Sequence, residues 1–175
     1  MKPFFKPKVY LSARVSPEYR KANKLIADAL SPYFEVFLPH EHNIEAIDPS
    51  SVPVKVFESN IGAMERADLC VIIPPFGRDC SWECGWFSGQ RKPVYIITKG
   101  DLSWLRDLMF KSTIDGVFTF SSFTEALLKR DVVLSGRDTC AIRVFDTFER
   151  LGEELLIAYV NNNDHGLLVP KELIK

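Results

Sequence analysis

Residues 69–97 read LCVIIPPFGRDCSWECGWFSGQRKPVYII, and this stretch decides the fold. An apolar run from Leu69 to Ile73 leads into two prolines, and a second apolar run covers Val94 to Ile97. Between them, Arg78–Gly85 carries two carboxylates into a predicted helix. A strand, a loop, a helix and a further strand form one parallel crossover unit, and such sheets bind ligands outside the carboxyl ends of their strands. Glu83 therefore lies where a ligand site is expected.

The rest of the chain repeats this alternation of strand and helix. Strands are predicted at 8–12, 34–38, 68–73, 93–98 and 116–120, and helices at about 16–30, 54–66, 78–90, 102–110, 122–129 and 146–159. Ser16-Pro17-Glu18 is typical of a helix start, with a capping residue, a proline and an acidic residue in order. Residues 131–144 are ambiguous and receive no assignment.

This alternation predicts an α/β fold with a doubly wound, five-stranded parallel sheet. Its expected strand order is 2-1-3-4-5, which is flavodoxin-like (Rossmann-like), with helices on both faces. A length of 175 residues is typical of one domain, 1–175.

Composition narrows the classes of function. A hydrophobic share of 46% and a charged share of 26% are ordinary for a soluble globular protein. The formal net charge is −1 and no basic block is present, which argues against a nucleic-acid polymer or an anionic membrane as partner. No run approaches the roughly 20 apolar residues of a membrane-spanning helix, and the N-terminus lacks the apolar core of a signal peptide. A cytoplasmic location is expected, with the four cysteines reduced.

Cofactor and metal motifs are missing from the sequence. There is no Gly-x-Gly-x-x-Gly, no phosphate-loop lysine motif and no Gly-x-Ser-x-Gly elbow. Cys80 and Cys84 are four residues apart, but the three histidines stand at no recognised zinc-ligand spacing. The motifs therefore give no support to a dinucleotide or triphosphate site or to a metal site, and we interpret these cysteines as packing residues.

The predicted topology brings three segments to one crevice. They are the end of the first strand (Tyr10–Arg14), the helix start near Asn60 and the loop before Glu83. The helix near Asn60 follows a polar segment, 40–53, without clear periodicity, and loops of that length are usually functional or disordered. A pocket is expected at this crevice.

Glu83 allows two interpretations. A carboxylate in the first turn of a helix stabilises it by a few tenths of a kcal/mol to about 1 kcal/mol. A carboxylate at a pocket floor can instead act as a nucleophile and form a covalent sugar ester. Asp79 is either a helix cap or a group that exchanges a proton with a substrate base. Trp82 is either a core residue or a wall on which a planar ring stacks.

Three segments, taken in this order, carry a resemblance to a known enzyme family. They are Val9–Ala13; Asn60, eight residues before Asp68; and Asp79–Gly85 followed by Gly89–Val94. In these segments the chain resembles the nucleoside 2-deoxyribosyltransferases and their relatives that hydrolyse nucleotide N-glycosidic bonds. The resemblance covers residues 8–98, with a weaker match at Asp115-Gly116.

The resemblance implies a two-step displacement without a metal or organic cofactor. Glu83 attacks the anomeric carbon of a 2′-deoxynucleoside, and a second base then takes the sugar. Tyr10 holds Glu83, while Asp79 and Asn60 orient the base, help to protonate it or bind the sugar. Further candidates for substrate binding are Ser12, Ala13, Arg14, Trp82, Asp115 and Gly116. The implied partners are a nucleoside or nucleotide and a free nucleobase, in a protein expected to be a homo-oligomer.

Arg14 leaves an alternative open. It is either a solvated loop charge or, next to a helix start, a ligand for a 5′-phosphate. A 2′-deoxynucleoside 5′-monophosphate N-glycosidase, in which water resolves the intermediate, is therefore the second hypothesis. A nucleotide-sensing module without turnover is the third, but such a module has no need for Tyr10, Asn60 and Glu83 together.

Overall fold

The computed structural model describes residues 6–42, 53–98, 104, 107–120, 141–145 and 150–162. Its elements are β1 (Lys8–Ala13), α1 (Pro17–Leu30), β2 (Glu35–Phe37), α2 (Pro39–His42), α3 (Pro53–Arg66), β3 (Leu69–Ile73), α4 (Arg78–Gly89), β4 (Val94–Thr98), α5 (Leu108–Lys111), β5 (Gly116–Phe120), β6 (Ala141–Phe145) and α7 (Leu151–Asn162). No helix within these ranges has both the length and the apolar character needed to cross a membrane.

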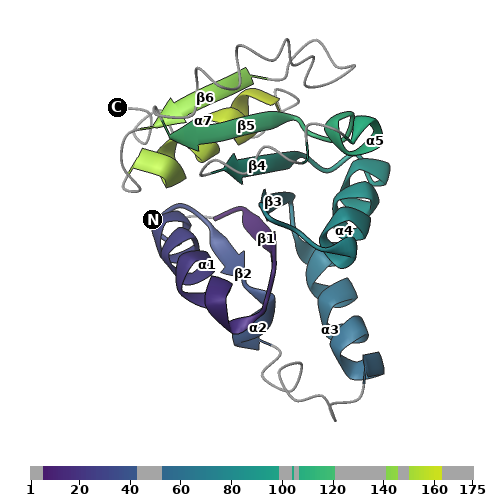
Figure 1. The fold of residues 1–175 in the computed structure, drawn as a ribbon. Coiled ribbons are helices and arrows are strands. Elements are labelled where there is room, and N and C mark those ends of the chain that lie inside the picture. The colour runs from purple at the N-terminus through teal and green to yellow at the C-terminus, as the bar shows by residue number, and fades with distance from the viewer. Residues whose placement is uncertain are drawn as a thin grey trace.

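The strands form one parallel sheet, in the order β2-β1-β3-β4-β5-β6 (Figure 1). The predicted order 2-1-3-4-5 is therefore confirmed. A sixth parallel strand, β6, extends the sheet beyond β5 in register from Gly116↔Ala141 to Phe120↔Phe145. It lies at the end of the segment that received no assignment from sequence.

Three details differ from the sequence predictions. Residues 39–42, at the start of the predicted 40–53 loop, form the short helix α2. In the described part of the predicted 102–110 helix, the structure has only α5 and a single turn at Trp104. Ser16 precedes α1 as predicted, but its side chain caps no backbone N–H of the helix. The predicted helix at 122–129 lies outside the described residues.

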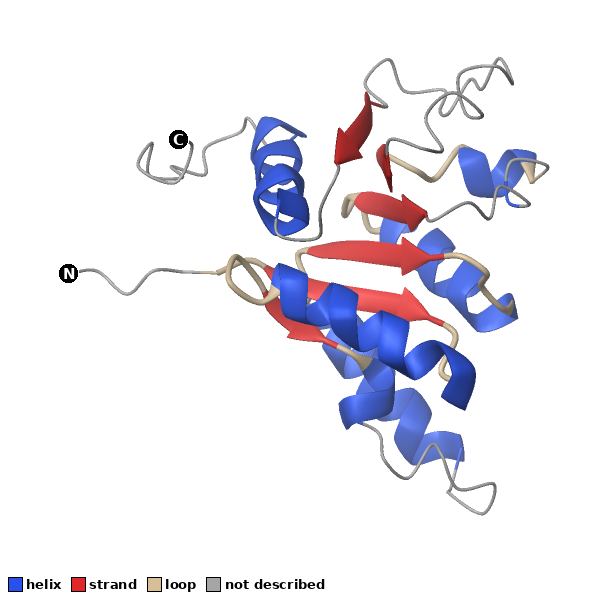
Figure 2. Cartoon of the chain, turned by 60° about the vertical axis from the view of Figure 1, so that its left-hand side comes forward, coloured by secondary structure: helices blue, strands red, loops and turns tan. Residues whose placement is uncertain are grey.

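Helices cover both faces of the sheet, with α1 on one side and α3 and α4 on the other (Figures 1 and 2). Successive strand side chains point to opposite faces. Val9 and Leu11 accordingly belong to the core beneath α1 and α7, whereas Tyr10 belongs to the core beneath α3 and α4. All residues of β3 and β4 are buried, as expected of strands covered on both faces. This alternation directs Tyr10 and Ser12 towards α4.

Candidate active site

Glu83 lies in the second turn of α4 and is only 9% exposed. Its carboxylate accepts two hydrogen bonds from β1: Tyr10 Oη donates to Oε1 at 2.6 Å, and Ser12 Oγ donates to Oε2 at 2.5 Å. Because the two donors are two residues apart on one strand, they share a face of the sheet. Both oxygens of one carboxylate are thus fixed by a single strand, as a preorganised nucleophile requires.

Packing fixes the Tyr10 ring as well as its hydroxyl. The side chain is fully buried, and Phe37 of β2 stacks on it with a centroid distance of 5.5 Å and an interplanar angle of 18°. Phe87 of α4 contacts the ring at 5.8 Å. Since the ring has little freedom to turn, its O–H remains directed at Glu83.

Burial dominates the electrostatics of this cluster. It raises the pKa of Glu83, and the nearby Asp79 carboxylate raises it further, while the Ser12 and Tyr10 hydroxyls act in the opposite direction. Burial and the Glu83 charge raise the pKa of Tyr10 far above its ordinary value, so Tyr10 remains a protonated donor. The outcome is a carboxylate more basic than usual, whose solvation is replaced by two hydroxyls.

Glu83 forms part of the wall of a cavity of about 460 Å³. The other lining residues are Ala13, Arg14, Val15, Ser16, Arg20, Pro39, His40, Val56, Asn60, Gly77, Asp79 and Cys80. They come from the β1–α1 loop and the first turns of α1, from α2, from α3, and from the start of α4. The cavity thus lies at the carboxyl ends of β1, β2 and β3, and its volume is typical of a small-molecule site.

The β1–α1 loop on one side of this cavity is held by two side chains of α1. Asn23 is 2% exposed and donates its Nδ2–H to the Arg14 carbonyl at 2.7 Å. Arg20 donates its Nε–H to the Val15 carbonyl at 2.9 Å. The loop that carries Arg14 is therefore fixed before any ligand binds.

Most of the residues singled out from sequence meet at this site. Ala13, Arg14, Asn60, Asp79 and Glu83 line the cavity. Tyr10 and Ser12 lie behind Glu83 and hold it; Ser12, predicted to bind substrate, donates to the carboxylate and is not among the residues that line the cavity. Asp79 is exposed in the first turn of α4, after the N-cap Gly77.

Three predicted residues are not brought to the cavity. Trp82 is 52% exposed on α4 and lies beside Phe57 of α3, with 6.3 Å between ring centroids. Asp115 and Gly116 stand at the amino end of β5, where Asp115 Oδ2 accepts the Val94 N–H at 2.8 Å. The amino ends of parallel strands lie at the edge opposite the Glu83 cavity, and strand direction therefore separates these residues from it.

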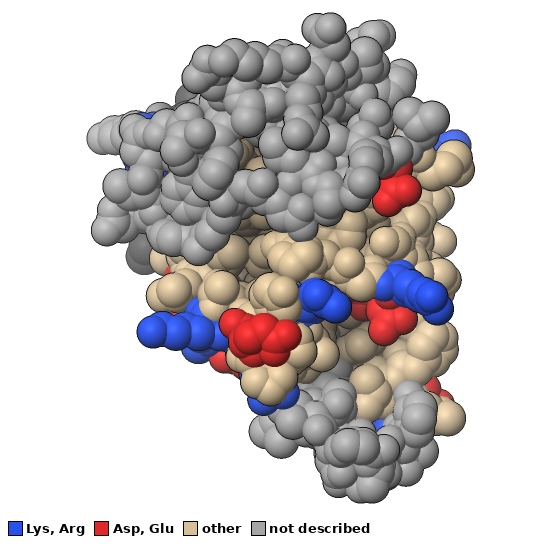
Figure 3. Space-filling model, viewed as in Figure 1, with Lys and Arg blue, Asp and Glu red and all other residues tan. Residues whose placement is uncertain are grey.

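Some lining residues were not singled out from sequence, notably Arg20, His40 and Cys80. His40 follows the carboxyl end of β2, so the rule on strand ends points to it. Among the described residues, no three His, Cys, Asp or Glu side chains cluster in a way that suits a metal ion. Basic and acidic side chains are interspersed on the face drawn in Figure 3, with neither sign forming a continuous field over the described surface.

No protein-family profile matches the chain, and no curated protein matches it. Solved structures do match the chain. A 2-deoxyribosyltransferase from Bacillus psychrosaccharolyticus is 22% identical, over 63% of this chain and 85% of that one, with a TM-score of 0.50. A conserved protein from Enterococcus faecalis V583 is 17% identical, over 87% of this chain and 99% of that one, with a TM-score of 0.51.

A CMP N-glycosidase from Clostridium botulinum is 14% identical, over 86% of this chain and 98% of that one, with a TM-score of 0.45. At these identities the likeness concerns the fold. The sequence resemblance to nucleoside 2-deoxyribosyltransferases is therefore confirmed at the level of the fold.

Proposed function

We propose that this protein is a nucleoside 2-deoxyribosyltransferase, which exchanges the base of a 2′-deoxynucleoside through a covalent deoxyribosyl ester of Glu83. One observation carries the proposal: the buried Glu83 carboxylate lines a cavity and has both oxygens held by Tyr10 and Ser12. The fold shared with a 2-deoxyribosyltransferase supports it. The partners are then a deoxynucleoside and a free nucleobase.

The reaction has two displacements at C1′ of the sugar. In the first, a Glu83 oxygen forms a bond to C1′, the C1′–N bond breaks, and the departing base takes the electron pair and a proton. In the second, a nitrogen of another base attacks C1′ and gives up its proton, the C1′–O bond breaks, and the Glu83 carboxylate is restored. A sugar without a 2′-hydroxyl suits this chemistry, because it tolerates the oxocarbenium character of the transition state.

Asn60 and Asp79 occupy the side of the cavity formed by α3 and α4. An amide supplies both a donor and an acceptor, and a carboxylate supplies an acceptor or, once protonated, a donor. We assign the base to this side, where Asp79 exchanges the proton that the departing base needs. The sugar then lies over Glu83.

A second candidate has a specific observation in its favour. Arg14, Arg20 and Ser16, the N-cap of the fourteen-residue helix α1, line the same cavity. Guanidinium groups and a helix N-terminus suit a phosphate. The alternative is therefore hydrolysis of a 2′-deoxynucleoside 5′-monophosphate, in which water attacks the same ester.

Two incubations separate the candidates. The protein is mixed with a 2′-deoxynucleoside and a different free base, and separately with a 2′-deoxynucleoside 5′-monophosphate alone, and products are resolved by chromatography. Exchange product in the first mixture supports transfer, and free base in the second supports hydrolysis. Intact-mass measurement after an acid quench should show added deoxyribosyl mass on the native protein and none on Glu83→Gln. If neither substrate is consumed and no mass is added, both proposals are wrong.

The variant Arg14→Ala helps to distinguish base transfer from hydrolysis of a 5′-monophosphate. If Arg14 binds a 5′-phosphate, the variant should lose activity on the monophosphate by about tenfold or more and retain it on the nucleoside. Equal activity of variant and native protein on both substrates would show that Arg14 is a solvated loop charge.

A further inference from the structure

His40 is a buried polar residue in the wall of the Glu83 cavity. It is 8% exposed and belongs to α2, directly after the carboxyl end of β2. Its Nδ1 atom is buried and has no hydrogen-bond partner among the residues that the structure describes. Buried polar atoms are nearly always paired, and leaving one unpaired costs free energy. Because Nδ1 is shielded from the cavity, Nε2 is the ring nitrogen that a ligand in the cavity can reach.

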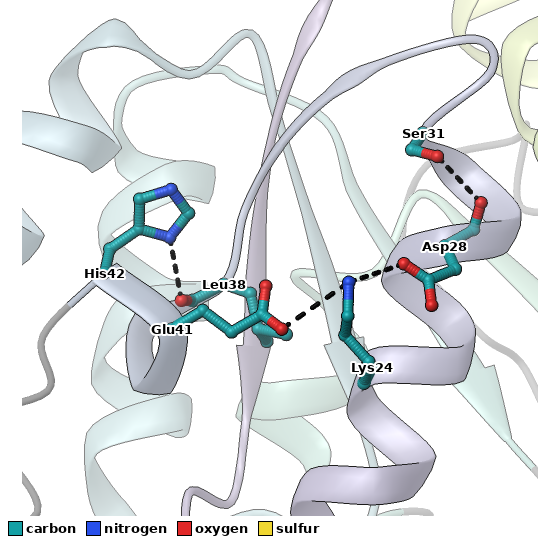
Figure 4. A network of polar contacts seen from close by, with 6 residues as sticks. All are labelled: Lys24, Asp28, Ser31, Leu38, Glu41 and His42. Atoms are coloured by element: carbon teal, nitrogen blue, oxygen red, sulfur yellow. Dashed lines mark hydrogen bonds and ion pairs between the residues drawn. The ribbon is translucent and has the colours of Figure 1, made fainter.

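Contacts with α1 hold the short helix that carries His40. Lys24 of α1 bridges Asp28 at 2.6 Å and Glu41 at 3.5 Å (Figure 4). On the same helix, His42 Nδ1 lies 3.0 Å from the Leu38 carbonyl oxygen. Both residues that follow His40 are therefore fixed, and so is the position of its backbone.

The charges that act on His40 come from α1 and from its own helix. Burial lowers its pKa, Arg20 and Lys24 lower it further, and Glu41 opposes them. Arg14, Asp79 and Glu83 are the other charged groups around the cavity. The ring is therefore neutral near pH 7, with one N–H donor and one acceptor nitrogen.

The ion pair between Lys24 and Glu41 joins the helix of His40 to α1, and Arg14, Ser16 and Arg20 line the cavity at this α1 end. Under the proposed function, the base lies against Asn60 and Asp79 and C1′ lies over Glu83. With the base and C1′ placed in this way, the C5′ side of the sugar lies at the α1 end of the cavity.

We propose that His40 is a substrate-binding residue whose imidazole hydrogen-bonds the oxygen carried on C5′ of the deoxynucleoside. The inference rests on the proposed function for the direction in which the substrate lies. The oxygen belongs either to a free hydroxyl or to a phosphate, and both present an acceptor to an imidazole N–H.

Binding measured without turnover tests this contact. All proteins carry Glu83→Gln, which cannot form the ester. The ligands are a 2′-deoxynucleoside, its 5′-monophosphate, and the 2′,5′-dideoxynucleoside that lacks the C5′ oxygen. With His40 present, we expect the 5′-hydroxyl ligand to bind about tenfold tighter than the dideoxy ligand, the factor that one good hydrogen bond provides.

His40→Phe should abolish that ratio while it leaves binding of the dideoxy ligand unchanged. A purely structural role would weaken all three ligands by the same factor. His42→Phe controls for a shift of the short helix: it removes the contact with the Leu38 carbonyl at a residue that does not line the cavity. A ratio that persists in this variant and is lost in His40→Phe belongs to the His40 ring, and loss of the ratio in both variants would overturn the contact. A larger loss with the monophosphate than with the nucleoside would identify the phosphate as the natural source of the oxygen.

If His40→Phe binds no ligand, thermal unfolding shows whether the variant is still folded. Because the substitution removes an unpaired buried nitrogen, the variant should unfold at the same or a higher temperature than its parent. A folded variant that still prefers the 5′-oxygen ligand tenfold overturns the inference alone, whatever the native enzyme catalyses. Failure of all three ligands to bind the parent overturns both the inference and the proposed function.

Discussion

Carboxylates have different tasks at the carboxyl edge of the parallel sheet, where the strands end, and at its amino edge, where the strands begin. At the carboxyl edge, Glu83 accepts hydrogen bonds from two side-chain hydroxyls and borders a cavity. At the amino edge, Asp68 and Asp115 each stand directly before a strand and bond the backbone of the neighbouring strand. The residue types are nearly the same, but their tasks differ.

The amino edge repeats one arrangement. The Asp68 N–H donates to the Lys8 carbonyl at 2.8 Å, and Asp68 Oδ2 accepts the Lys8 N–H at 2.7 Å. Likewise, the Asp115 N–H donates to the Val94 carbonyl at 2.7 Å, and Asp115 Oδ2 accepts the Val94 N–H at 2.8 Å. Each aspartate thereby satisfies the first N–H of the adjacent strand, in β1 and in β4.

The difference follows from strand direction. At the amino edge, backbone N–H groups at the strand starts need acceptors, and a carboxylate there is occupied by the backbone. At the carboxyl edge, loops diverge and leave room for a ligand. Glu83 is held by side chains, so its oxygens remain next to the cavity. Carboxylates at the amino edge should therefore contribute to stability, and Glu83 to chemistry.

Glu83→Gln should give the largest effect on activity. The amide keeps the shape of the side chain but cannot form the ester, so the rate should fall on the order of 10³-fold or more. Stability at pH 7 should stay the same or rise, because a buried carboxylate with a raised pKa is replaced by a neutral group. Deoxyribosyl transfer and denaturant unfolding measure the two quantities. A variant that loses stability and retains activity would reverse the roles of the two edges.

Tyr10→Phe should come next. It removes the 2.6 Å hydrogen bond to Glu83 but keeps the stacked ring, and a bond to a charged group is worth about 1.5–3 kcal/mol, so the rate should fall roughly 10- to 10²-fold. The pKa of Glu83 should rise further, because one of the bonds that stabilise its charged form is lost. The acid limb of the pH–rate profile should therefore move to higher pH.

Tyr95→Phe is the matched control for that variant. Tyr95 is a fully buried tyrosine on β4, and its hydroxyl accepts a 2.8 Å hydrogen bond from Asn162 rather than contacting Glu83. Loss of the Tyr95 hydroxyl should lower the free energy of unfolding and leave the acid limb of the pH–rate profile in place. If both variants shift the acid limb equally, the contact between Tyr10 and Glu83 is not what sets it.

Asp115→Ala should reduce stability rather than activity. The substitution leaves the Val94 N–H without its 2.8 Å acceptor, and should lower the free energy of unfolding by about 1–3 kcal/mol. Activity per folded molecule should not change, since Asp115 lies at the edge away from the cavity. Urea unfolding and a rate normalised to folded protein check this. If a stable variant lost activity, the result would instead support the sequence-based assignment of Asp115 to substrate binding. Since Asp115 does not line the cavity of its own chain, it would then reach the cavity of a second copy.

The alternation of strands and helices predicted the sheet order, and the unbroken apolar runs of β3 and β4 indicated strands covered on both faces. The sequence was not sufficient for β6, since an edge strand needs no such run. The contact between Tyr10 and Glu83 was implied by resemblance, and period-two alternation would have added Ser12. Asp115 and Trp82, predicted from sequence to bind substrate, do not line the cavity, because one stands at the amino end of β5 and the other on an exposed face of α4. His40 belongs to no motif, and although its place after the carboxyl end of β2 points to it, the cavity lining in the structure was needed to identify it.

The smallest effect expected is the dependence of stability on pH, and it opposes that of activity. The pKa of Glu83 is raised in the folded protein, so its contribution to stability is fully present below the unfolded pKa and is lost as pH rises through the folded pKa. Activity needs the charged carboxylate and should appear over that same rise. The difference in unfolding free energy between native protein and Glu83→Gln, followed from pH 4 upward, isolates this group, because glutamine does not titrate. The native protein should lose stability relative to the variant across the pH range in which its rate increases. Parallel curves for the two proteins would mean that Glu83 has the same pKa in the folded and unfolded states, and this prediction would be wrong.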